Sequence, residues 1–184
     1  MKIIEPPAVE EWSGILKGKD IQSYRKHFSD VSSYYLNAEG MDAETVMYDV
    51  YSSSSEEKAD GSLEWGLTVL YPVSVNGECN MTKGHFHMDE SCEEIYIGKA
   101  GEGLLMYMDH TGNTWCEKVF SGSVHRISGR YAHRLINTGD EPLKVMACWN
   151  SRAGHNYEAI QKQPFGYRVM KKDGKAEAVK NEQL

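Results

Sequence analysis

Apolar and polar residues alternate in short runs from about residue 45 onward, and turn residues separate one run from the next. Alternation with a period of two is typical of a strand that buries one face. The runs that fit this pattern are Val46–Ser52, Leu63–Val73, Glu94–Gly98, Gly103–Met108, Thr114–Phe120, Ser123–Ile127, His133–Asn137 and Leu143–Trp149. Many short strands with closely spaced turns predict an all-β protein, an antiparallel sandwich or barrel over residues 45–170.

The two ends of the chain have other patterns. Within residues 1–44, apolar and aromatic residues recur at near-helical intervals over Val9–Lys17 and Asp20–Tyr35, which predicts a short helical or extended cover on the barrel. The polar stretch Ser52–Gly61 is expected to be an exposed loop, and the charged tail 171–184 is expected to fray. No repeat and no shift of composition separates a second domain, so we expect residues 1–184 to form a single one.

Charge and cysteine content narrow the possible partners. The formal charge of −7 argues against nucleic acid and anionic membranes, because both reward basic surfaces. No apolar run approaches the length of a membrane helix and the N-terminus lacks a signal-peptide pattern, so a cytoplasmic location is expected. The four cysteines form no close pair and are expected to be unpaired thiols. Cys92 lies nearest the candidate chemistry, but its spacing from His87 resembles a turn, so it is not expected to be a ligand.

The candidate chemistry is concentrated in His85, His87, Glu94 and His133. Two histidines two positions apart on a strand point to the same face. A carboxylate from the returning strand and an imidazole from a later strand would complete a site of three imidazoles and one carboxylate. Such a set suits a first-row divalent ion and leaves positions open for water or substrate. The sequence therefore predicts one divalent metal ion and does not choose among Fe, Mn, Ni and Zn.

Strand parity selects the carboxylate from the several that follow the histidines. Glu94 and Tyr96 share one face of their strand, whereas Glu93, Ile95 and Ile97 share the other. A tyrosine beside a ligand fits a polar cavity, and two isoleucines fit packing against another layer. Glu94 is therefore the predicted ligand. The remaining histidines, at positions 27, 110 and 125, are not expected to bind metal.

The ligand blocks resemble a known family. Gly84-His85-Phe86-His87, Glu94, Gly101-x-Gly103 and the block of His133 and Asn137-Thr138-Gly139 are similar to the two cupin motifs. More narrowly, Thr82–His87, Tyr131–Arg134, Gly139–Pro142, Ala153–Tyr157 and Leu67–Pro72 resemble the cupin-type glucose-6-phosphate isomerases, over about residues 40–170. The resemblance implies a cupin fold (a double-stranded β-helix, or jelly-roll barrel). It also implies a homodimer with one divalent metal ion per subunit, which interconverts glucose 6-phosphate and fructose 6-phosphate in glycolysis and gluconeogenesis.

The resemblance also implies roles for the reacting residues. Glu94 would be both a metal ligand and the base that moves a proton between C1 and C2 through a cis-enediol, while a hydride shift stays open as the alternative. His155 would relay protons at the ring oxygen or at the hydroxyls, because a histidine pKa lies near neutrality. Tyr96 and Tyr157 would hydrogen-bond sugar hydroxyls.

Neutral donors are expected to hold the phosphate. Thr68, Thr82 and the backbone N–H of Gly84 would supply them, since a missing Cβ lets a ligand approach the backbone. Lys83 lies nearby, but alternation points it away from the face of Thr82.

One residue departs from the family pattern. Better-known members of the family carry a tyrosine where this chain has Trp149, and an indole can neither accept a hydrogen bond nor shuttle a proton. Trp149 is therefore expected to stack on the sugar, or else the activity is altered. Two other functions use the same ligands: an iron-dependent cupin dioxygenase or related oxidoreductase, and a non-catalytic cupin that binds a sugar phosphate. The edge of Thr82 and Gly84, together with His155, favours the isomerase.

Overall fold

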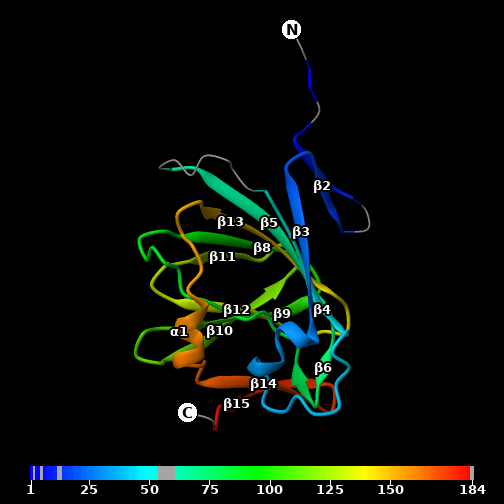
Figure 1. Ribbon diagram of the computed structural model, residues 1–184, viewed down its shortest axis with the longest axis vertical. Helices are drawn as coiled ribbons and strands as arrows, with labels where there is room; N and C mark the ends of the chain where they lie inside the picture. Colours follow the sequence, from blue (N-terminus) through cyan, green and yellow to red (C-terminus); the bar gives the residue numbers. More distant parts are fainter. Residues whose placement is uncertain (2, 5, 12–13, 54–60, 183–184) are drawn as a thin grey trace.

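The computed structural model describes residues 1, 3–4, 6–11, 14–53 and 61–182. Most of them belong to antiparallel sheets (Figure 1). The largest sheet has the order β11 (Val124–Ile127), β8 (Glu94–Ala100), β13 (Leu143–Asn150), β5 (Leu63–Leu70), β4 (Val46–Ser53) and β3 (Ile21–His27). A second sheet has the order β10 (Thr114–Phe120), β9 (Glu102–Met108) and β12 (Ala132–Asn137). Every strand expected from alternation is therefore present, with ends that differ by up to three residues.

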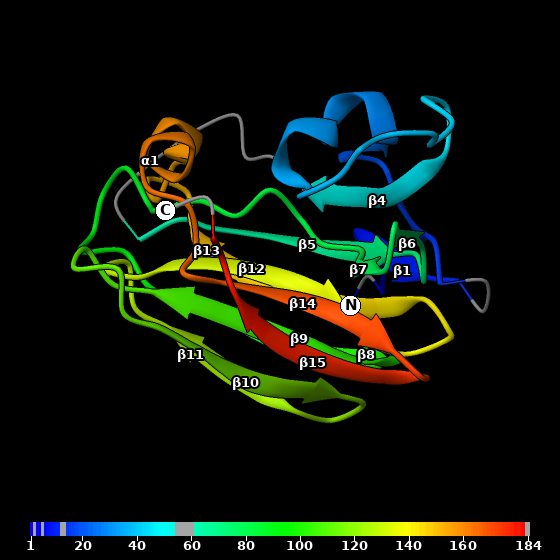
Figure 2. The same ribbon diagram turned by 90° about the horizontal axis from the view of Figure 1, so that it is seen from below.

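Smaller elements close the remaining sides (Figure 2). They are the sheet β15 (Lys175–Lys180), β14 (Tyr167–Lys172), β7 (Glu78–Cys79), β6 (Ser74–Val75), the pair β1 (Ala8–Glu10) and β2 (Leu16–Gly18), and the helix α1 (Tyr157–Lys162). No helix in the described part of the chain is long and apolar enough to cross a membrane.

The core lies between the two large sheets. Met47 and Leu70 project from one sheet, Met106 and Leu135 from the other, and all four are buried in one cluster. Burying each of these side chains stabilises the fold by about 1.5–3 kcal/mol. The two large sheets thus form the barrel that the alternation predicts, and the chain has the all-β cupin fold.

An irregular segment attached to β12 positions the candidate site. Residues 80–87 run beside β12 through isolated bridges of Met81 with Ile136 and of His85 with His133. The N–H of His85 donates to the carbonyl of His133 at 3.2 Å, and the N–H of His133 donates back at 3.1 Å. This pairing places the histidine pair directly against the later histidine.

The helices expected over Val9–Lys17 and Asp20–Tyr35 are wrong. The first range contains β1 and β2, and the second contains β3 followed by two short 3-10 turns, Phe28–Asp30 and Ser32–Tyr34. The reason is tertiary, because β3 forms a ladder with β4 along its whole length. That pairing outweighs the weak helical spacing of the aromatic residues.

The tail is also more ordered than expected. Residues 167–180 form the hairpin of β14 and β15 instead of fraying, and Lys172 pairs with Lys175 across a two-residue loop. Asp173 and Gly174 in that loop have φ of +50° and +75°. An Asp-Gly pair is a strong hairpin signal because it tolerates these left-handed conformations. Most of the loop expected over Ser52–Gly61, residues 54–60, lies outside the described residues.

Candidate metal and substrate site

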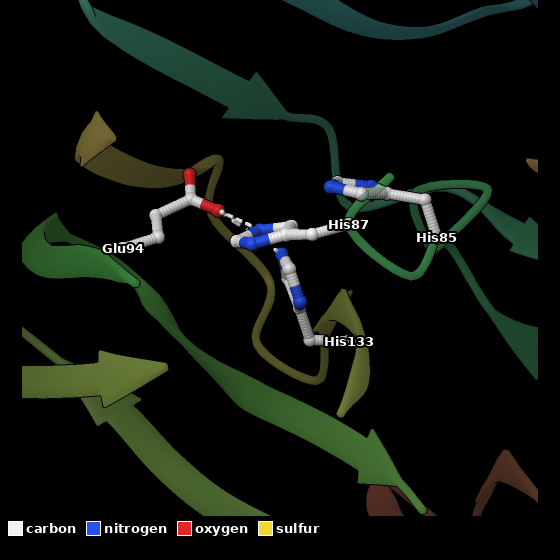
Figure 3. Close-up of side chains that lie close together, drawn as sticks. All are labelled: His85, His87, Glu94 and His133. Atoms are coloured by element: carbon white, nitrogen blue, oxygen red, sulfur yellow. Dashed lines mark hydrogen bonds and ion pairs between the residues drawn. The ribbon is translucent and has the colours of Figure 1, made fainter. Parts of the chain in front are cut away.

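Three parts of the barrel bring the predicted ligands together (Figure 3). His85 and His87 come from the irregular segment, Glu94 begins β8 and His133 lies in β12. One ligand atom from each residue lies within 4.8 Å of the others. His87, Glu94 and His133 are buried, and His85 is half-buried. The sequence separation of 48 positions between His85 and His133 thus closes into one cluster.

The second ring nitrogen of two histidines fixes how they face this cluster. His87 Nδ1 lies 2.9 Å from the carbonyl oxygen of Cys92, and His133 Nδ1 lies 3.3 Å from that of Tyr131. A carbonyl only accepts, so each Nδ1 donates and each Nε2 is left to face Glu94. Backbone carbonyls orient metal-binding histidines in this way.

The imidazole nitrogens and the carboxylate of the cluster converge on one point. His87 Nε2 and His133 Nε2 each lie 3.2 Å from Glu94 Oε2, and the second contact lacks hydrogen-bond geometry. Nε2 of His85 and Nε2 of His133 are buried without a hydrogen-bond partner in the described chain. Three imidazole nitrogens and a carboxylate oxygen that converge in this way fit a divalent cation.

The pKa shifts of His85 and Glu94 keep these two ligands in their metal-binding forms. Burial, and then the nearby His133, lowers the pKa of His85 well below its usual value, so its ring stays neutral. Burial alone would raise the pKa of Glu94, but contacts with His133 and His87 outweigh it and lower that pKa. Burial alone would lower the pKa of His87, but its hydrogen bond with Glu94 raises it. Glu94 is therefore ionised at neutral pH.

The neighbours of Glu94 follow the expected parity. Glu94 and Tyr96 face inward, whereas Glu93 points outward and accepts a hydrogen bond of 2.9 Å from Arg126 Nε. Ile95 and Ile97 share the outer face and are 45% and 39% exposed, so the expectation that they pack against another layer is wrong. An apolar outer face on β8 therefore remains uncovered within the described chain.

A cavity of about 270 Å³ opens beside the cluster. All the residues expected to contact substrate lie on its wall together with His85: Thr68, Thr82, Gly84, Glu94, Tyr96, Trp149, His155 and Tyr157. His87 and His133 are not among the residues on its wall.

Sequence reasoning missed several other wall residues. Tyr24, Tyr48 and Glu64 also line the cavity. Tyr24 was hidden by the wrong expectation of a helix over its segment. Parity could have found Glu64, because it shares a face of β5 with Thr68.

His155 and Tyr157 stand over the open side of the cluster. The ring centre of His155 lies 4.3 Å from that of His85, and the ring stacks on Tyr157 at 5.7 Å with an interplanar angle of 8°. Burial lowers the pKa of His155, so its ring is neutral at physiological pH. Burial raises the pKa of Tyr157 to about 12 and that of Tyr96 well above its usual value, so both phenols remain donors.

Trp149 lies in β13 and is in register with Glu94 of β8. It pairs with Glu64 across β13 and β5, and its Nε1 donates to Glu64 Oε2 at 3.0 Å. The indole lies against Gly66, where an added Cβ would be 3.3 Å from Trp149 Cη2. The expected stacking of this ring on a sugar stays a prediction.

The fold and the site together define a class. Antiparallel strands that enclose three inward imidazoles and one carboxylate beside a substrate-sized cavity are the arrangement of a cupin whose site could hold a metal ion. Among solved structures, Bacillus subtilis oxalate decarboxylase, which has Mn(II) centers, is similar at a TM-score of 0.47 and 20% identity. That match covers 58% of this chain and 26% of the other.

The family model of glucose-6-phosphate isomerase (GPI) matches residues 25–184. Three similar proteins carry that same name. The one from Thermococcus kodakarensis is 35% identical, over 85% of this chain and 84% of its own. The one from Pyrococcus horikoshii is 33% identical, over 92% and 90%. The one from Sinorhizobium medicae is 28% identical, over 88% and 78%. The chain belongs to the glucose-6-phosphate isomerase family, and the expected resemblance is confirmed.

Proposed function

We propose that this protein interconverts glucose 6-phosphate and fructose 6-phosphate with one divalent metal ion held by His85, His87, Glu94 and His133. One observation carries the proposal: His85 and Glu94 of the ligand cluster line the same cavity as the His155–Tyr157 pair and as Thr82 and Gly84. The name shared by the relatives, which align over most of the chain, supports the same reaction.

Aldose–ketose isomerisation moves one proton between C1 and C2 and another between their oxygens. A divalent ion in the cluster would supply Lewis-acid polarisation of the sugar oxygens. Glu94 contacts the imidazoles through Oε2, and Oε1 makes no hydrogen bond within the described chain. We infer that Oε1 takes the proton from C2 and returns it to C1, through a cis-enediol. The lowered pKa of Glu94 makes it a weak base, so a hydride shift between the two carbons is the competing route.

Neighbouring groups would handle the oxygen-bound protons and hold the sugar. His155 is neutral, so one nitrogen can accept a proton while the other donates, as a relay between two hydroxyls requires. Tyr96 and Tyr157 would donate hydrogen bonds to hydroxyls.

The far edge of the cavity would hold the phosphate. The Thr82 hydroxyl oxygen accepts from the N–H of Leu135 at 3.0 Å, which leaves its proton free to donate. Thr68 faces the same space, and Gly84 brings its backbone to the wall. Gly84 has φ of +75°, and an added Cβ would lie 2.9 Å from Phe165. Only glycine fits both constraints.

We further infer a homodimer, and the exposed face of Ile95, Ile97 and Val124 on β8 and β11 offers an apolar surface to a second copy. We infer a role in glycolysis and gluconeogenesis from the family resemblance. The cytoplasmic location stays the expectation drawn from the sequence pattern.

A coupled assay with fructose 6-phosphate tests the proposal. Chelated protein should lose turnover, and addition of Fe, Mn, Ni or Zn should restore it, while elemental analysis reports the bound ion. Full activity of metal-free protein would contradict the metal site. Tight binding of fructose 6-phosphate without product would favour a non-catalytic cupin. Oxygen-dependent turnover of an unphosphorylated substrate would favour the oxidoreductase.

A further inference from the structure

Arg134 is a buried cation that no part of the proposed reaction has used. It follows His133 on β12 and points to the opposite face of the strand, away from the ligand cluster. Its guanidinium carbon lies 4.2 Å from the centre of the Phe165 ring. The residue is only 7% exposed.

The hydrogen bonds of Arg134 do not neutralise it. Nη2 donates to the carbonyl oxygen of Lys83 at 2.6 Å, and Nη1 contacts the sulfur of Met81 at 2.9 Å. Nε has no partner, and no carboxylate forms an ion pair with Arg134 anywhere in the described residues. Arg168 is buried to the same degree, yet it donates to Glu78 Oε1 at 2.8 Å. The charge of Glu78 also acts on Arg134 from a distance, but that carboxylate is paired with Arg168. A buried cation without an ion pair of its own is costly to the fold, which points to an anionic ligand nearby.

The peptide between Lys83 and Gly84 connects Arg134 to the cavity. All described peptides are trans, so the carbonyl of Lys83 and the N–H of Gly84 point in opposite directions. The carbonyl points at Arg134, and Gly84 lines the cavity on the other side. The Gly84 N–H makes no hydrogen bond within the described chain. A cation bound to the carbonyl polarises the peptide and strengthens the donor at its other end.

We propose that Arg134 is a positioning residue for the anionic group of the substrate. It holds the Lys83–Gly84 peptide with its N–H directed into the cavity, and it adds a buried positive charge behind that peptide to the one that Lys83 brings to the cavity wall. Phe165, stacked under the guanidinium, keeps it in place. The identity of the anion as a sugar phosphate rests on the proposed function, whereas recognition of the anion itself does not.

Selective labelling gives a direct test on the wild-type protein. A glycine follows a lysine at only two places, Lys17-Gly18 and Lys83-Gly84. Carbonyl-13C lysine with 15N glycine therefore yields two amide signals, and Gly18 serves as an internal control. Inorganic phosphate should shift the Gly84 amide proton and leave that of Gly18 in place. A Gly84 signal that stays fixed at phosphate concentrations that inhibit turnover overturns the proposal.

Variants separate the charge from the fold. R134M should raise the KM for fructose 6-phosphate and the inhibition constant of phosphate about tenfold, with a smaller effect on kcat. R134K, which keeps the charge, should recover part of that loss. The matched control R168M should leave both constants unchanged among folded molecules. Unchanged constants in R134M would overturn the proposal. A wild-type protein that shifts Gly84 with phosphate but does not isomerise would contradict the proposed function and leave the role of Arg134 standing.

Discussion

Two buried polar clusters lie in the same barrel and differ in whether their polar atoms have hydrogen-bond partners. In the first, which we call the paired cluster, Arg168 donates to Glu78 at 2.8 Å and to Asn181 at 3.0 Å, and Asn181 in turn donates to the carbonyl of Phe165 at 3.0 Å. In the second, the ligand cluster, the buried Nε2 atoms of His85 and His133 have no hydrogen-bond partner in the described chain. Satisfied buried groups stabilise a fold, whereas unsatisfied ones cost stability and indicate a missing ligand.

The largest effect is expected in the ligand cluster. Glu94→Gln removes the only carboxylate there and with it the proposed base, so kcat should fall about 10³-fold or more. The fold should survive, because Gln keeps the shape of the side chain. The coupled isomerase assay measures the loss, and elemental analysis reports the metal. Glu93→Gln is the matched control, because Glu93 points outward to Arg126, and it should leave kcat unchanged. Equal activities of the two variants would remove Glu94 from the mechanism.

The paired cluster should respond in stability instead of activity. Glu78→Gln takes the carboxylate charge away from buried Arg168 and should destabilise the fold by about 3 kcal/mol. Denaturant unfolding measures the change, and kcat per folded molecule should stay near the wild-type value. If Glu78→Gln instead kept full stability and lost kcat, the paired cluster would have a role in the reaction, which contradicts the proposed difference between the two clusters.

The sequence predicts the barrel well because a period of two is a strong local signal. The same signal selects Glu94 over Glu93, because adjacent residues of an extended segment point to opposite faces. Glu94 begins β8 and is buried, whereas Glu93 precedes the strand and is exposed. Short motifs placed the residues on the cavity wall, because each motif carries its chemistry in adjacent positions. These successes all depend on information within a few residues.

What the sequence did not reveal depends on contacts between distant segments. Strand β3 exists because it pairs with β4, so its own residues show little of it. Arg134 resembles any surface arginine until residues 80–87 fold against β12 and cover it. Burial without a counter-ion is a property of the assembled fold and leaves no mark on a single stretch of sequence.

The ion pair of Arg25 and Asp49 at the protein surface extends the comparison, because its contribution to stability depends on pH. Burial alone would raise the pKa of Asp49, but hydrogen bonds from Arg25 at 2.7 Å and Tyr71 at 2.8 Å lower it. Because the folded-state pKa is depressed, the stabilisation is complete above the unfolded value of about 4 and is lost as the pH falls through the folded value. Arg25 is about half exposed, so solvent screens the ion pair and limits its contribution to stability.

Thermal unfolding of the wild type and of Asp49→Asn between pH 3 and pH 7 measures this contribution. The Tm difference should be constant near neutrality and should shrink below about pH 4, because the wild-type carboxyl is then protonated as well. A difference that persists unchanged at pH 3 would assign the stabilisation to shape instead of charge.

The smallest effect is expected where a satisfied pair lies inside the cavity. Trp149 donates a hydrogen bond to Glu64, so this satisfied pair should shape the cavity wall without taking part in the reaction. The resemblance to the family leads one to expect a tyrosine at this position. Trp149→Phe removes one hydrogen bond of about 1 kcal/mol and should raise KM about fivefold with kcat unchanged. Trp149→Tyr restores a donor and adds an acceptor. If Trp149 only shapes the cavity wall, the Tyr variant should match the wild type in kcat. A large rise in kcat would mean that a phenol at this position can take part in proton transfer, which the wild-type protein does without. Glu64→Gln is the matched control, because its carbonyl oxygen still accepts from the indole and its KM should stay close to that of the wild type.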